Sequence, residues 1–181
     1  VLWSMGVWVE QHTSHNASQT AELIAEFRRL SLAVDGVLLL PPSAWTYQDS
    51  KLLPEWDAER FPSPKQLLSQ FGKYATHLCM HTIPAALAES TIFAELEDRG
   101  WLLVGESGDA HVFEGVAATG GKPFGLLDLT HRDAMKTWSE RHRHLVEEGV
   151  GATACDVQFD IPDHVVARGG ESGAVLRSLY P

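Results

Sequence analysis

The feature that most constrains the fold is a short run of small and β-branched residues at 150–157, preceded by Gly149 and followed by Pro162. Such a run, bounded by turn residues, predicts a buried parallel strand. One carboxylate, Asp156, interrupts it near its C-terminal end. Burying an unpaired carboxylate would cost several kcal/mol, so we expect Asp156 to lie where the strand emerges. In a (β/α) barrel, catalytic groups collect at that end of the strands.

The rest of the chain alternates between strand and helix patterns. We predict strands near residues 5–10, 36–41, 77–82 and 150–157, and helix-length segments separate each pair. Strands that alternate with helices imply a parallel sheet with right-handed crossovers. We therefore expect the four strands to lie side by side, parallel, in chain order.

Helix starts are marked by capping residues. Asn16 is followed by Gln19 at the third position, and Ser63 is followed by proline and then Gln66. Both patterns are typical of helix N-termini. Ser90 and Thr130 mark two further starts, with Thr130 expected to cap the longest helix.

Two regions do not continue the alternation of strand and helix patterns. Residues 105–125 are rich in glycine and predict a hairpin-like insertion, and residues 160–181 are expected to be irregular. A closed eight-stranded barrel needs about 250 residues. Four strand–helix steps in 181 residues predict an α/β fold with parallel strands and crossover helices and are half of such a barrel. A small doubly wound domain is the alternative.

Composition excludes several classes of protein. The formal net charge of −10 leaves no basic stripe for phosphates, so no nucleic-acid partner is expected. No apolar run has the length of a membrane span, so no membrane partner is expected. The two cysteines, Cys79 and Cys155, fall in predicted strands and are interpreted as buried thiols rather than a disulfide.

Several segments together resemble glycoside hydrolase family 31, the α-glucosidase and α-xylosidase family, over nearly the whole chain. The most specific is Trp56-Asp57 followed by Arg60-Phe-Pro-Ser-Pro64. The others are Gly6-Val-Trp-Val9, Phe93-Ala-Glu-Leu-Glu-Asp-Arg-Gly-Trp-Leu102, Leu127-Asp-Leu-Thr130 and the stretch 149–162.

The resemblance implies that residues 1–181 form the first half, strands 1–4, of a (β/α)8 catalytic TIM barrel within a longer protein. It also implies a retaining hydrolase of α-linked glucosides or xylosides that forms a covalent glycosyl-aspartate intermediate. Asp156 falls on the family's nucleophilic aspartate, and the acid/base aspartate would lie beyond Pro181. The expected partner is a carbohydrate substrate. This chain alone is expected to be incomplete and inactive.

Sugar-contacting positions depart from the family pattern. The nucleophile motif is Asp156-Val-Gln-Phe159, without the family's glycine and glutamate, and Ala154 replaces a lysine. Pro42 takes the place of a substrate-binding aspartate, and His81 that of a pocket tryptophan. These differences favour two alternatives: a catalytically silent carbohydrate-binding homologue, or an unrelated small α/β binding domain.

Other candidate residues are few. His81 at the end of the third strand and Trp45 beside the second are candidate substrate-binding residues, because aromatic and polar rings line sugar pockets, whereas Trp56 is expected to be scaffold. His142 and His144 lie two apart on a helix and cannot chelate together, and the pair His12 and His15 lacks a nearby carboxylate or thiol, so no metal is expected. No phosphate-loop or dinucleotide pattern occurs in the glycine-rich stretch, so no cofactor is expected.

Overall fold

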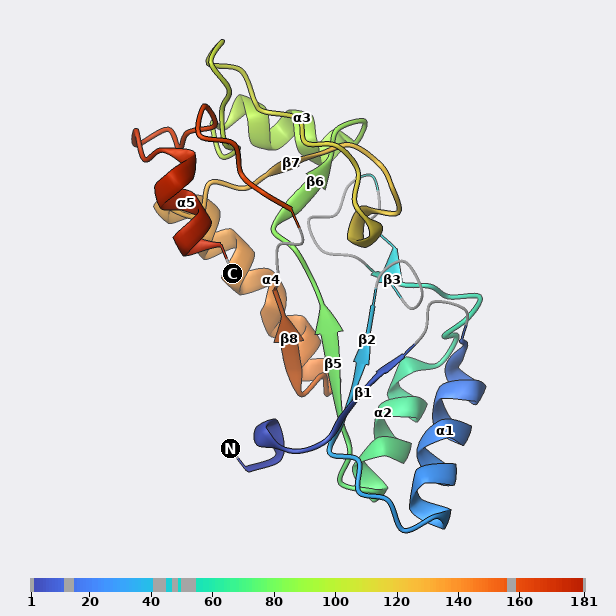
Figure 1. The fold of residues 1–181 in the computed structure, drawn as a ribbon. Helices are drawn as coiled ribbons and strands as arrows, with labels where there is room; N and C mark the ends of the chain where they lie inside the picture. The colour runs from blue at the N-terminus through green and yellow to red at the C-terminus, as the bar shows by residue number, and fades with distance from the viewer. Residues whose placement is uncertain are drawn as a thin grey trace. The chain divides into compact units, whose positions relative to one another are not determined.

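The structure is a computed structural model that describes residues 2–11, 15–40, 45–46, 49, 55–155 and 159–180 (Figure 1). The chain divides into two compact units. Unit 1 comprises Val1–Thr46, Trp56–His81 and His144–Ala154, and unit 2 comprises Tyr47–Glu55, Thr82–Arg143 and Cys155–Pro181.

Unit 1 is built on a four-stranded sheet with the order β1-β2-β5-β8. All three neighbouring pairs are parallel, which confirms the predicted order and direction of the strands. The strands are β1 (Trp8–Gln11), β2 (Gly36–Leu39), β5 (His77–His81) and β8 (Ala152–Ala154). The first strand begins later than predicted, because Leu2–Met5 forms a 3₁₀ turn, η1, ahead of it.

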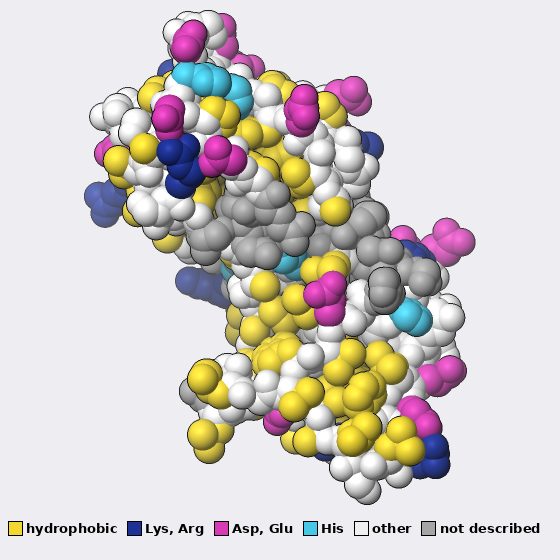
Figure 2. Space-filling view, viewed as in Figure 1, with side chains coloured by type: hydrophobic (Ala, Val, Ile, Leu, Met, Phe, Trp, Pro, Cys, Tyr) yellow, Lys and Arg dark blue, Asp and Glu magenta, His cyan; other side chains and the backbone are white. Residues whose placement is uncertain are grey.

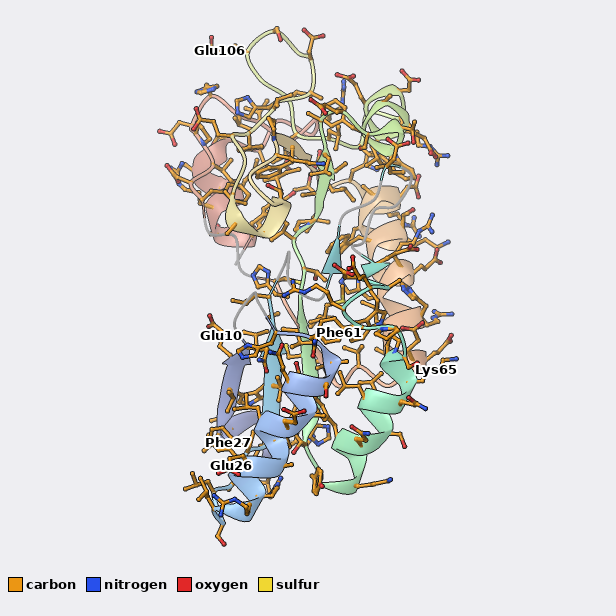
Figure 3. All side chains as sticks on the ribbon, turned by 90° about the vertical axis from the view of Figure 1, so that its right-hand side faces the viewer. Glu10, Glu26, Phe27, Phe61, Lys65 and Glu106 are labelled. Carbon is orange, nitrogen blue, oxygen red and sulfur yellow. The ribbon has the colours of Figure 1, made fainter. Side chains whose placement is uncertain are left out.

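Two helices of unit 1, α1 (Ala17–Arg29) and α2 (Pro64–Lys73), lie side by side against the sheet (Figures 1 and 3). Asn16 caps α1 as predicted, and Gln19 completes the capping box. The guanidinium of Arg28 ties α1 to the segments that enter β2 and β5, since its Nη2 donates to the carbonyl oxygens of Val34 at 2.9 Å and Tyr74 at 2.6 Å. Helix α2 begins at the predicted proline, but within the described residues the Ser63 side chain makes no capping hydrogen bond.

The two faces of the sheet differ in burial. Val37, Leu39, Leu78 and Met80 are at most 1% exposed and pack under the helices. On the other face of β1 and β2, Glu10 is exposed and Leu38 is half-buried. The face of β1 and β2 that carries Glu10 and Leu38 is therefore less covered than the face that carries Val37 and Leu39.

Unit 2 is organised around an antiparallel pair, β6 (Ala85–Leu87) with β7 (Phe124–Leu126), and the helix α3 (Thr91–Asp98). Ser90 caps α3 as predicted, accepting from the Phe93 backbone at 3.2 Å. The glycine-rich stretch is held by antiparallel bridges from Val104 to Ala110 and from Phe113 to Phe124, as a hairpin-like insertion requires. A 3₁₀ turn, η2 (Ala117–Thr119), lies within it.

Two sequence predictions about unit 2 are wrong. The tail is not irregular throughout, because it contains the helix α5 (Gly173–Leu179), whose Leu176 is fully buried. Thr130 does not cap the long helix α4, which runs over Arg132–Glu148. Its hydroxyl donates instead to Asp128 Oδ1 at 2.5 Å, and the ring of His131 accepts from the Ala134 backbone at 3.4 Å.

β3 (Trp45–Thr46) pairs with β4 (Glu55–Trp56) in a two-stranded sheet. Both cysteines are thiols; Cys79 is buried as predicted, but Cys155 is partly exposed because it follows the last residue of β8. None of the described helices combines the length and apolarity needed to cross a membrane.

The edges of the sheet and the exposed apolar side chains near them affect whether the isolated chain associates with itself. Among the described strands, β1 and β8 form the two edges, and Leu2 and Met5 near β1 are 94% and 88% exposed. Figure 2 shows apolar side chains gathered over unit 1. Unpaired edges and apolar faces promote association.

We therefore predict that the 181-residue chain alone self-associates through its barrel edges or is marginally stable. Sedimentation should show species larger than a monomer. A variant with Leu2→Lys and Met5→Lys should shift that distribution toward the monomer. A monodisperse, cooperatively unfolding wild-type monomer would contradict the prediction.

Candidate functional site

The C-terminal ends of the four parallel strands define the candidate site. The register places Gln11 opposite Leu39, Leu39 opposite Met80, and His81 opposite Ala154. The four strand ends therefore meet along one edge of the sheet. In parallel α/β folds, ligand-binding and catalytic groups collect at this edge.

His81 is the last residue of β5 and is only 3% exposed. Its register partner, Ala154, ends β8 two residues before Asp156. Residues directly opposite each other on neighbouring strands have side chains on the same face. The β5–β8 ladder thus places His81 beside the strand end that leads to Asp156.

Three of the predicted site positions lie wholly or partly outside the described residues. Asp156 belongs to the segment 156–158 and Pro42 to the segment 41–44, neither of which the structure describes. The backbone of Trp45 lies in β3, but its side chain is outside the description. Trp56 is scaffold, as expected: its ring lies 5.6 Å from that of Phe61, and its Nε1 donates to Glu148 Oε2 at 3.4 Å.

A polar cluster in unit 2 was not anticipated from the sequence. Thr82, directly after β5, lies with its Oγ1 at 3.2 Å from the Cys155 Sγ, directly after β8. The same hydroxyl lies 3.3 Å from His142 Nε2 on α4, and His142 Nδ1 lies 2.8 Å from the Trp138 carbonyl oxygen. The only signal in the sequence was that Cys155 immediately precedes Asp156.

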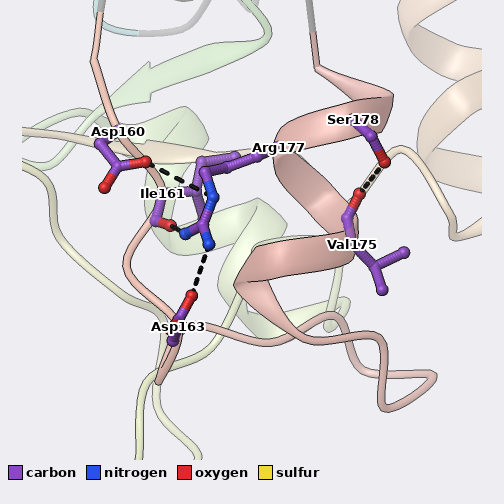
Figure 4. A network of polar contacts seen from close by, with 6 residues as sticks. All are labelled: Asp160, Ile161, Asp163, Val175, Arg177 and Ser178. Carbon is purple, nitrogen blue, oxygen red and sulfur yellow. Dashed lines mark hydrogen bonds and ion pairs between the residues drawn. The ribbon is translucent and has the colours of Figure 1, made fainter.

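The segment that follows Asp156 is tied to α5 by Arg177 (Figure 4). The guanidinium donates to the Ile161 carbonyl oxygen at 2.5 Å and to Asp163 Oδ1 at 2.6 Å, and its Nε lies 3.7 Å from Asp160 Oδ1. The hydrogen bond with Asp163 raises the pKa of Arg177 above its ordinary value. Asp160 and Asp163 are thereby engaged as ion-pair partners of Arg177.

Among the described residues of unit 2, the histidines form no three-ligand metal site. His111 and His164 lie with ring centroids 5.5 Å apart over an open depression. His142 is engaged by the Thr82 and Trp138 contacts, and His12 is outside the described residues. In the part of the chain that the structure describes, no three His, Cys, Asp or Glu side chains are placed to hold a metal ion.

Burial, followed by the charge of His164, lowers the pKa of His111 below its ordinary 6.5. As the pH falls below the ordinary pKa of histidine, the unfolded chain binds more protons than the folded chain. The free energy of unfolding therefore decreases. We predict that the thermal midpoint falls between pH 7 and pH 5, and falls less in a His111→Gln variant. His164→Gln should also reduce the fall, because it removes the second cause. An identical fall in wild type and His111→Gln would refute the assignment.

Residues 1–174 match the family model described as the glycosyl hydrolases family 31 TIM-barrel domain. The chain is 27% identical over 168 residues to the alpha-xylosidase XylQ of Lactiplantibacillus pentosus, an alignment that covers 88% of this chain and 20% of XylQ. An alpha-xylosidase of Saccharolobus solfataricus is 22% identical over 103 residues, covering 57% of this chain and 14% of that protein. The chain thus spans about a fifth or less of the curated relatives it matches.

Solved structures share the fold. A family 31 dextranase of Flavobacterium johnsoniae, complexed with glucose, superposes with a TM-score of 0.80 at 17% identity over 98% of this chain and 22% of its own. A family 31 alpha-xylosidase from a soil metagenome, complexed with xylose, superposes with a TM-score of 0.73 at 17% identity over 96% of this chain and 26% of its own.

Proposed function

The chain belongs to glycoside hydrolase family 31, and on that basis we propose that it forms the first four strands of the catalytic barrel of a longer enzyme, a retaining α-glycosidase with Asp156 as its nucleophile. The observation that carries the proposal is the position of Asp156 in the chain. In the sequence it stands two residues after Ala154, the last residue of β8, and β8 ends at the sheet edge where the other three strands also end. The proposed substrates are α-linked glucosides or xylosides.

The proposed chemistry proceeds in two displacements. The Asp156 carboxylate attacks the anomeric carbon, the glycosidic C–O bond breaks, and a carboxylic acid elsewhere in the barrel protonates the leaving oxygen. Water, deprotonated by that same group, then attacks the anomeric carbon and releases Asp156. In this arrangement His81 and Trp45 form part of the wall of the sugar pocket.

The acid/base partner is proposed to lie outside these 181 residues. Asp160 and Asp163 are unsuited to the role, because both are engaged by Arg177 and are 77% and 79% exposed. A general acid must carry a proton to give to the leaving oxygen, whereas both of these carboxylates are engaged as ion-pair partners of a guanidinium.

The test of the proposal is covalent labelling of the full-length enzyme. A mechanism-based α-glycosyl fluoride should trap the intermediate on Asp156 and on no other residue of this chain. Peptide mass mapping after proteolysis locates the label. The Asp156→Asn variant is the matched control and should remain unlabelled. A label on Asp160 or Asp163 would refute the assignment of Asp156.

A second function is a silent homologue that binds carbohydrate without cleaving it. It is favoured by Ala154 and Pro42 at positions where the family carries a lysine and an aspartate, and by the burial of His81. Calorimetric binding of α-xylosides or α-glucosides without turnover or labelling would support this reading against the first.

A further inference from the structure

Two histidines of unit 2 that are far apart in the sequence, His111 and His164, lie together in the fold. Their ring centroids are 5.5 Å apart, and the planes of the rings are inclined by 72°. Both line an open depression of about 450 Å³. Among the described residues, neither imidazole has a hydrogen-bond partner, so the ring nitrogens of both are available to a ligand.

Backbone pairing holds the two segments that carry these histidines. Val104 forms antiparallel bridges both with Ala110, the residue before His111, and with Val166, two residues after His164. Both segments are therefore paired with the same extended stretch of chain. Their separation is fixed by the hydrogen bonds of unit 2 and does not depend on the side chains of the two histidines.

Packing restricts the imidazoles themselves. The His111 ring lies edge to face against that of Phe113, with centroids 4.6 Å apart. A Cβ added at Gly105 would lie 3.5 Å from His111 Nδ1, so the glycine leaves the space beside that nitrogen open. His164 is exposed, but the next residue, Val165, is fully buried and anchors its backbone. Ligand groups that are already in place lose little conformational entropy on binding.

The separation of the rings fits one shared metal ion. A bond between Zn²⁺ and an imidazole nitrogen is about 2.0–2.1 Å, so two imidazoles on one tetrahedral ion have ring centroids roughly 5–6 Å apart. The observed 5.5 Å lies in that range. Imidazole nitrogen suits Zn²⁺, whereas Mg²⁺ and Ca²⁺ prefer oxygen ligands. Glu106, labelled in Figure 3, and Asp109 line the same depression with exposed carboxylates, whose charge favours a cation there.

We propose that His111 and His164 form a binding site for one Zn²⁺ ion, with water in the coordination positions that the two imidazoles leave open. Within the described ranges no set of three His, Cys, Asp or Glu side chains could hold a metal ion, so the site differs from a structural zinc site with four protein ligands. The bound ion links the glycine-rich insertion to the segment before α5. The site is independent of the catalytic role of Asp156.

Histidine footprinting of the full-length enzyme with diethyl pyrocarbonate near neutral pH tests the site. The reagent acylates imidazole nitrogens that carry no metal, and peptide mass mapping after proteolysis reports each histidine separately. We expect Zn²⁺, added alone, to protect His111 and His164 from acylation, whereas Mg²⁺ at the same concentration should protect neither. His144, an exposed histidine on α4, should keep reacting at the Zn²⁺ concentration that protects His164.

Each histidine of the pair reports on the loss of the other. In His111→Gln, half-protection of His164 should require at least about 10-fold more Zn²⁺, because loss of a ligand costs at least as much affinity as loss of its outer-shell support. His164→Gln should weaken the protection of His111 by a similar factor. His144→Gln is the matched control and should leave the protection of His164 unchanged. Thermal midpoints without metal check that all three variants are folded.

Three outcomes would overturn the proposal. They are a His164 that stays reactive at saturating Zn²⁺, equal protection by Mg²⁺, and an unchanged Zn²⁺ requirement for His164 in the His111→Gln variant. The last result would show that His164 binds the ion without His111.

Discussion

Replacing Asp156 with alanine in the full-length enzyme should reduce kcat by several orders of magnitude while leaving the thermal midpoint nearly unchanged. The attacking oxygen is lost, and removing a covalent nucleophile eliminates a whole pathway rather than one hydrogen bond. The fold should tolerate the change, because a carboxylate at a strand end contributes little apolar burial. Steady-state kinetics on an aryl α-xyloside or α-glucoside, with azide as a competing nucleophile, would measure the loss and any rescue.

Two carboxylates of the same segment serve as matched controls. Asp160→Asn and Asp163→Asn remove exposed groups that pair with Arg177, and exposed ion pairs contribute little to stability. Both variants should keep kcat within a few-fold of wild type. A wild-type kcat in Asp156→Ala would refute the assignment of Asp156 as the nucleophile. If the wild-type enzyme and all variants are inactive but still bind sugar, the silent homologue is favoured.

The second large effect is expected at Asp128, which is 1% exposed in unit 2. Its Oδ1 accepts from the Thr130 backbone at 3.0 Å and the Thr130 hydroxyl at 2.5 Å, and its Oδ2 accepts from the Arg168 backbone at 2.9 Å. Removing the carboxylate leaves these donors without their acceptor. Asp128→Ala should therefore lower the free energy of unfolding by about 3 kcal/mol.

Asp128→Asn separates hydrogen bonding from shape at this position. The amide retains one acceptor oxygen but turns an N–H₂ group toward a donor. The free energy of unfolding of Asp128→Asn should therefore lie between that of wild type and that of Asp128→Ala. Asp109→Ala, an exposed aspartate of the same unit, is the control and should change stability by less than about 0.5 kcal/mol. Chemical denaturation measures all three variants, and an Asp128→Ala protein as stable as the control would contradict the role of Asp128.

Local sequence patterns determined the strand and helix order of this protein. The apolar runs that became β2, β5 and β8 and the caps at Asn16 and Ser90 act over a few residues, so they are visible in the sequence. Helix-length crossovers then require parallel strands, which is why the order β1-β2-β5-β8 was predictable. The resemblance carried by Trp56-Asp57 and by residues 60–64 supplied the family and the candidate role of Asp156.

Tertiary structure alone decided which distant polar groups meet. Thr82 and Cys155 are 73 residues apart, and Asp128 and Arg168 are 40 apart. Thr130 matched a capping pattern but bonds Asp128 instead, because a buried carboxylate needs donors more than an exposed helix end needs a cap. Likewise, α5 forms in a glycine-containing tail because its Leu176 packs into the core of unit 2. Such contacts depend on strand register and packing, which no short stretch of sequence encodes by itself.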